Sequence, residues 1–144
     1  MSLNERQQQV IQEFNGIQSW EDRYKLIIDL GKKLPELAPE KKTEDAKVKG
    51  CQSQVWLHAE LSPDGRVILA GDSDALIVRG LVAVLLRIYS GSTPAEILQS
   101  TPSFLQELGF KENLSPSRAN GLFSMLKQIQ HFATAFAYLQ QSKR

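Results

Sequence analysis

Residues 55–71 decide the fold, and they read VWLHAELSPDGRVILAG. Apolar and polar side chains alternate from Val55 to Glu60, and this period of two predicts a β-strand. The segment Ser62–Gly65 is typical of a tight turn, because its proline fixes φ and its glycine accepts positive φ. Residues 66–71 then form a returning strand, so the sequence predicts an antiparallel hairpin. We expect Trp56, a large aromatic side chain at a strand position, to lie in the core.

Helical patterns flank this hairpin on both sides. We expect helices over 4–14, from Ser19 to Gly31, over 75–89, from Thr93, from Thr101 to Gly109, and from Ser115 onward. The helix over 75–89 is apolar on nearly all sides and should be the central buried one. The last helix carries an apolar stripe from Ala119 to Phe136 that includes Phe123.

Strands grouped together, with helices elsewhere, indicate an α+β fold in which a small antiparallel sheet has helices packed on one face. A third strand around Thr43–Lys49 would strengthen so small a sheet, although the polar composition of that segment argues against it. The length of 144 residues predicts one domain over 1–144.

The composition excludes several classes of protein. The net charge of +1 is too small for a nucleic-acid-binding domain. The longest apolar run, 75–89, is too short and too interrupted by charge to span a membrane. One cysteine and two histidines cannot supply a cysteine-based or three-histidine metal site, and one cysteine cannot form an internal disulfide. The segment Met1–Arg6 lacks the features of a secretory signal, so we expect a cytoplasmic protein.

Cys51 is the first candidate for chemistry. It follows Gly50 at the point where a polar segment meets the first strand, outside any periodic apolar pattern. Lys47 and Lys49 are close in sequence and could favour the nucleophilic thiolate. The alternative is that Cys51 is a small buried hydrophobic residue, the commoner state of a free cysteine.

A cysteine hydrolase would pair this thiol with a histidine. His58 lies in the first strand and His131 in the last helix, and we expect both to be solvated surface residues. In the cluster Asp72–Asp74, we expect Asp72 or Ser73 to cap the following helix rather than to carry out acid–base chemistry.

The start of the last helix holds two unexpected residues. Arg118 would oppose the helix dipole at a helix N-terminus, so another interaction should explain it. Gly121 costs about 1 kcal/mol relative to alanine inside a helix, which suggests close packing or a functional approach.

Several blocks of the sequence resemble the SufE family, the sulfur-acceptor partners of cysteine desulfurases, and the closely related CsdE proteins. The blocks are 20–24 (WEDRY), 30–35 (LGKKLP), 48–57 (VKGCQSQVWL), 71–74 (GDSD), 77–81 (IVRGL) and 114–122 (LSPSRANGL). Together they extend over almost the whole chain beyond the first predicted helix. The block around Cys51 is the most specific of them.

The resemblance implies a function. In the family, a pyridoxal-phosphate cysteine desulfurase holds sulfur from L-cysteine as a persulfide, and the residue that matches Cys51 accepts that sulfur. The resemblance implies that the chain also stimulates the desulfurase. An iron–sulfur scaffold complex then receives it. The resemblance implies that Asp74, Arg118 and Gln52 bind the partner, that the chain needs no cofactor or metal of its own, and that it has no independent turnover. The family fold is similar to that of the scaffold IscU, but one cysteine cannot assemble a cluster.

Two other interpretations of the residues stay open at this stage. The chain could be a freestanding cysteine hydrolase or thiol transferase that uses Cys51 with His58 or His131. It could also be an interaction module in which Cys51 is structural. The sequence does not decide between a SufS-like and a CsdA-like desulfurase as partner.

Overall fold

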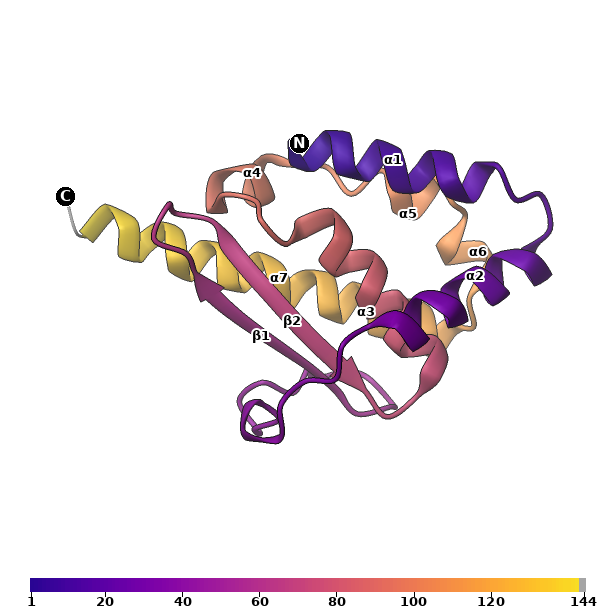
Figure 1. Cartoon of the computed structure of the whole chain (residues 1–144), viewed down its shortest axis with the longest axis horizontal. Helices are drawn as coiled ribbons and strands as arrows, with labels where there is room; N and C mark the ends of the chain where they lie inside the picture. Colours follow the sequence, from indigo (N-terminus) through magenta and orange to yellow (C-terminus); the bar gives the residue numbers. More distant parts are fainter. Residues whose placement is uncertain (143–144) are drawn as a thin grey trace.

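The computed structural model describes residues 1–142, which form an α+β fold with a two-stranded sheet and several helices (Figure 1). The elements in chain order are α1 (Leu3–Asn15), α2 (Trp20–Lys33), the 3-10 turn η1 (Pro39–Lys41), β1 (Val55–Leu61), β2 (Val67–Ser73), α3 (Leu76–Tyr89), α4 (Pro94–Gln99), α5 (Phe104–Glu107), α6 (Phe110–Asn113) and α7 (Pro116–Ser142). The predicted fold class is confirmed.

The predicted hairpin is present. Strands β1 and β2 pair antiparallel, from Val55 opposite Ser73 at one end to Leu61 opposite Val67 at the other. In the turn between them, Gly65 has φ of 84°, a conformation that favours glycine. The face of the sheet that carries Val55, Leu57, Val67 and Leu69 is buried, whereas Ile68 on the opposite face is 44% exposed. Helices therefore cover one face of the sheet, as expected.

The segment before β1 does not form a third strand. Lys47 makes a single bridge with Trp56, with hydrogen bonds from Val48 N to Val55 O (2.8 Å) and from Leu57 N to Ala46 O (2.9 Å). The expectation that Trp56 belongs to the core is wrong. Trp56 is only partly buried, and the Lys42 ammonium lies over its ring, 5.2 Å from the ring centroid.

Helix α3 is the central helix of the fold, as its composition predicts. It contacts α1, α2, α7 and β2, and in Figure 1 it lies between the hairpin and α1. It crosses α2 at two glycines. A Cβ on Gly80 would lie 2.0 Å from the carbonyl oxygen of Ile27, and one on Gly31 would lie 2.7 Å from that of Leu76. The backbones of α2 and α3 are therefore in direct contact, which fixes α3 as a rigid support for what lies against it.

Helix α7 covers the same sheet from beside α3. It contacts α3 and β1, and its buried residues are Ala119, Gly121, Leu122, Met125, Leu126, Ile129 and Ala133. The predicted apolar stripe is therefore confirmed for most of its length. Phe123 departs from it and is 40% exposed, because it follows Leu122 by about 100° around the helix.

Helix capping follows the sequence at two of the expected positions. Ser19 accepts a hydrogen bond from Asp22 N at the start of α2, and Thr93 forms a capping box with Glu96 at the start of α4. The capping role expected for Asp72 or Ser73 is wrong, because both residues belong to β2 and the cap position of α3 is Ala75.

Candidate functional site

Cys51 lies in a short loop, residues 49–54, that joins the bridge at Lys47 to strand β1. We call it the cysteine loop. Gly50 precedes the thiol with φ of 90°, and a Cβ there would lie 2.8 Å from Ser124 Oγ of α7. The positive φ therefore favours glycine at this position, and any Cβ there would also force the Ser124 hydroxyl to move.

The two ends of the cysteine loop are fixed by hydrogen bonds. At the base, Val48 N donates to Val55 O. At the C-terminal end, Gln54 N donates to Asp74 Oδ1 (3.0 Å), Asp74 N donates to Gln54 O (3.2 Å), and the Ser73 hydroxyl donates to the same carbonyl (2.8 Å). These bonds hold the loop ends while leaving the residues around Cys51 to be placed by contacts with α7.

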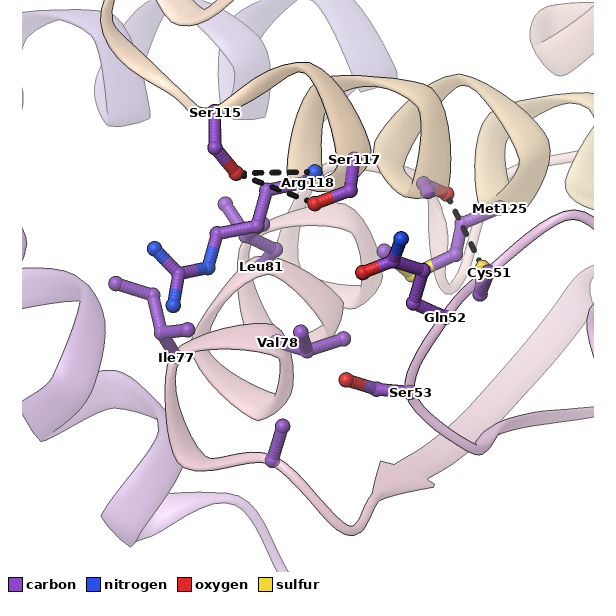
Figure 2. A pocket seen from close by; sticks show the side chains of 12 residues that line it. Cys51, Gln52, Ser53, Ile77, Val78, Leu81, Ser115, Ser117, Arg118 and Met125 are labelled. Atoms are coloured by element: carbon purple, nitrogen blue, oxygen red, sulfur yellow. Dashed lines mark hydrogen bonds between the residues drawn. The ribbon is translucent and has the colours of Figure 1, made fainter.

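The thiol of Cys51 packs against Gly121. Its Sγ lies 3.7 Å from the carbonyl oxygen of Gly121, and a Cβ on Gly121 would lie 3.4 Å from the same sulfur. The close packing that Gly121 suggested in the sequence is therefore the approach of the thiol to α7. Figure 2 shows the sulfur turned toward the helix.

A pocket of about 250 Å³ lies beside the thiol, between the cysteine loop, the start of α3 and the start of α7. The apolar floor comes from α3 and α7 and includes Val78, Leu81 and Met125. Arg118 and Gln52 line the pocket as exposed polar side chains, and Figure 2 shows the Arg118 guanidinium on the Ile77 side of the pocket, away from Cys51. The backbone N–H of Arg118 donates to Ser115 Oγ (3.3 Å), so Ser115 helps to cap α7.

Burial raises the pKa of the Cys51 thiol. Lys47 forms an ion pair with Glu44, with Nζ 3.1 Å from Oε1. The expectation that Lys47 and Lys49 favour the thiolate is wrong for this conformation, since burial is the dominant influence on the thiol and acts in the opposite direction. The inward thiol is therefore protonated and weakly nucleophilic at neutral pH.

The structure brings three of the four predicted site residues to one pocket. Cys51, Gln52 and Arg118 line it, whereas Asp74 lies outside it, exposed, and binds the end of the cysteine loop. Within residues 1–142, Arg118 has no carboxylate within ion-pair distance. Its guanidinium is thus available to a partner.

The two histidines are remote from the pocket lining. His58 Nε2 lies 3.1 Å from Glu60 Oε1 on strand β1, and His131 is exposed on α7. The structure therefore does not form a Cys–His pair in this conformation. In the described part of the chain, no cluster of three or more His, Cys, Asp or Glu side chains could hold a metal ion, and no helix is long and apolar enough to cross a membrane.

Asp72, expected as a helix cap, instead anchors the segment that leads toward the cysteine loop. Its buried carboxylate accepts hydrogen bonds from Leu37 N (3.1 Å) and Ser73 N (2.8 Å). Lys42 Nζ lies 3.3 Å from one carboxylate oxygen of Asp72, and Arg79 Nε lies 3.2 Å from the other. The Arg79 contact is an ion pair whose geometry does not meet that of a hydrogen bond. Sequence reasoning missed this role, because the partners of Asp72 lie up to 35 residues away.

Comparison with known proteins decides the family. The SufE family, described as an Fe-S metabolism associated domain, matches residues 8–133. The chain belongs to the SufE family. It is 49% identical over 130 residues to an uncharacterised SufE-like protein of Rhizobium etli, covering 87% of each chain. It is 42% identical over 127 residues to another in Synechocystis sp., covering 88% of this chain and 79% of that relative.

A solved structure has the same fold. The solution structure of a hypothetical protein from Thermus thermophilus matches with a TM-score of 0.76 over 92% of this chain and 96% of that one, at 24% identity. The family match over residues 8–133 confirms the resemblance to the SufE family that the sequence indicated, and with it a relation to iron–sulfur metabolism.

Proposed function

We propose that this SufE-family chain is a sulfur acceptor that takes persulfide sulfur from a cysteine desulfurase onto Cys51 and passes it on for iron–sulfur cluster assembly. The observation that supports this most directly is the placement of the thiol. Cys51 stands on a loop that is fixed at both ends, and its sulfur makes one hydrogen-bond contact, with the Gly121 carbonyl. Such a thiol can be exposed by a change in the loop alone.

The proposed reaction is a thiol exchange on a persulfide. The Cys51 thiolate attacks the terminal sulfur of the persulfide on the desulfurase, so that a bond forms between the two sulfurs and the bond inside the enzyme persulfide breaks. The electron pair of the broken bond leaves with the enzyme cysteine as a thiolate. The products are a Cys51 persulfide and a free enzyme thiol, with no external oxidant or reductant.

The conformation described here represents the idle carrier in this scheme. The raised pKa of Cys51 keeps the thiol protonated while it packs against α7. Movement of the loop toward the partner would remove the burial that raises the pKa and so restore the thiolate. We propose that Gln52 and Arg118, which line the pocket, contact the desulfurase, and that Asp74 acts by holding the end of the loop.

The remoteness of both histidines from the pocket speaks against the alternative of a freestanding hydrolase or thiol transferase. General-base activation needs a base within hydrogen-bond reach, and thiol exchange does not. We therefore propose that the chain has no independent turnover, needs no cofactor, and acts in a reducing compartment such as the cytosol, where its single cysteine stays free. The scaffold complex as sulfur recipient is part of the same proposal.

Intact mass spectrometry tests the function. After incubation with a pyridoxal-phosphate cysteine desulfurase and L-cysteine, the wild-type chain should gain the mass of one sulfur atom, which a reductant then removes. Cys51→Ser should gain none, and Ser53→Ala, a change in the same loop, should gain one. A wild-type chain that gains no sulfur, or a Cys51→Ser chain that does, would contradict the proposal.

A further inference from the structure

A second groove lies beside the cysteine loop, and its lining shares no residue with the pocket of Cys51. It has a volume of about 420 Å³, and its lining includes Asp45, Lys47, Lys49, Ser124, Lys127 and His131. Its two walls are the segment that enters the cysteine loop and the middle of α7. We call it the lysine groove.

The lysine groove is positively charged. Three lysines line it against one carboxylate, that of Asp45, although the whole chain carries a net charge of only +1. Within the described residues, Lys49 and Lys127 have no carboxylate within 4.0 Å, and both are exposed. Lys47 is engaged by Glu44, whose side chain is 87% exposed, and such a surface pair is easily exchanged for another carboxylate.

The groove is continuous with the cysteine loop. Ser124, which lines the groove, is the residue that approaches Gly50, the neighbour of Cys51. Along α7, Gly121 contacts the thiol, Ser124 follows one turn later, and Lys127 and His131 follow on the groove side. A protein surface that reaches Cys51 therefore also lies beside Lys49 and Lys127.

We infer that the lysine groove docks an acidic segment of the cysteine desulfurase that delivers sulfur to Cys51. This inference rests on the proposed function and adds to it the chemistry of the contact. The carboxylates of the segment pair with Lys49 and Lys127 and replace Glu44 at Lys47. Exposed complementary charges accelerate encounter and fix the register of docking, so the groove places the partner over the cysteine loop.

The test measures the dissociation constant of the desulfurase for four forms of the chain. They are the wild type, the double variant Lys49→Glu/Lys127→Glu, the neutral variant Lys49→Gln/Lys127→Gln, and the control Lys25→Glu/Lys33→Glu, which makes the same charge change at exposed positions of α2. We expect the groove charge reversal to raise Kd about tenfold at low salt, the neutral variant to raise it less, and the control to leave it unchanged. In about 0.5 M NaCl, where charges are strongly screened, the Kd of the wild type should approach that of the charge-reversed variant.

Sulfur gain at saturating desulfurase separates this inference from the proposed function. All four forms should gain one sulfur there, because saturating desulfurase compensates for a higher Kd and every form keeps Cys51 and the residues that line its pocket. If the wild type gains sulfur but the groove variants bind as it does, or the control weakens binding equally, the lysine groove is not the docking site and the proposed function stands. If the wild type neither binds the desulfurase nor gains sulfur, both are wrong. Melting curves check that each form is folded. If the charge-reversed variant is unfolded, the Kd of the neutral variant tests the docking site instead.

Discussion

The sulfur of Cys51 lies 3.7 Å from the carbonyl oxygen of Gly121, at a turn of α7 where the absence of a side chain leaves room for it. The same glycine would carry a Cβ 3.4 Å from the sulfur, closer than most such contacts. The methyl group of an alanine at this position would therefore press against the thiol. The contact is made across 70 residues of sequence and sets the burial that raises the pKa of Cys51.

Gly121→Ala should expose the thiol without weakening the fold. The added methyl crowds the sulfur, while alanine favours the helix by about 1 kcal/mol relative to glycine. We expect faster alkylation of Cys51 by iodoacetamide and a pH–rate midpoint shifted down toward the ordinary cysteine pKa of about 8.5. The wild-type midpoint should lie above that value, since burial raises the thiol pKa. Equal midpoints in the two proteins would contradict the role of Gly121. The control is Gly16→Ala, just after α1, where a Cβ would make only ordinary van der Waals contacts.

Asp72→Asn should destabilise the fold at neutral pH by about 3 kcal/mol, because removing one partner of a buried ion pair leaves the other uncompensated. Burial acts to raise the pKa of Asp72, but hydrogen bonds from Leu37 and Ser73 and the cations of Lys42 and Arg79 lower it overall. A carboxyl whose folded pKa is lowered stabilises above its unfolded pKa of about 4, and this stabilisation is lost as the pH falls further.

Urea unfolding between neutral and acid pH checks this prediction. The difference in unfolding free energy between wild type and Asp72→Asn should be constant above about pH 5 and should shrink below about pH 4. Asp64→Asn in the exposed hairpin turn is the comparison, and it should cost far less. A pH-independent difference would mean that the carboxylate charge is not what Asp72 contributes.

Arg118→Ala should weaken binding to the desulfurase by about 1–3 kcal/mol while leaving the melting temperature unchanged. The guanidinium is exposed at the rim of the pocket, and its backbone bond to Ser115 survives the change. Arg66→Ala, at the hairpin end opposite the cysteine loop, is the matched control and should bind normally. Titration of both variants, with melting curves, measures the effect. Unchanged affinity for the desulfurase would show that Arg118 is an ordinary solvated surface residue. A lower melting temperature would show that it stabilises the fold.

Gly80→Ala should be the most damaging small change in the chain. Its Cβ would lie 2.0 Å from the backbone of Ile27, so α2 and α3 would have to separate. We expect a loss of at least about 3 kcal/mol of unfolding free energy, the upper end for overpacking, despite the gain in helix propensity. Thermal and urea unfolding measure it. A variant as stable as the wild type would show that the helices can separate at little cost.

Local patterns predicted much of the fold. The alternation of β1, the proline and glycine of the hairpin turn, and the caps Ser19 and Thr93 act within a few residues, so the sequence displays them directly. Trp56 and Asp72 were assigned wrongly because their surroundings come from the distant segment around Leu37 and Lys42.

The candidate site was predictable in its chemistry but not in its electrostatics. The position of Cys51 after Gly50 and the unusual Gly121 were both visible in the sequence. The contact between Cys51 and Gly121 depends on how α7 packs against the cysteine loop. The same packing makes burial, rather than the nearby lysines, decide the direction in which the pKa of Cys51 shifts. The floor residues of the pocket on α3 carry only a core pattern, and no signal in the sequence separates them from the rest of that helix.

The contact of α2 and α3 through Gly31 and Gly80 determines which part of the site can move. Because the backbones touch, α3 cannot slide or tilt without breaking the packing at Ile27, so the pocket floor stays in place. In the described part of the chain, residues 50–53 make one hydrogen bond to α7, from the thiol to Gly121, so the loop can open with its ends still bonded. In amide hydrogen exchange, α3 should then exchange only through global unfolding, whereas residues 50–53 should exchange through local opening. Under the proposed function, sulfur transfer then requires a few residues of the cysteine loop to move while α3 stays in place.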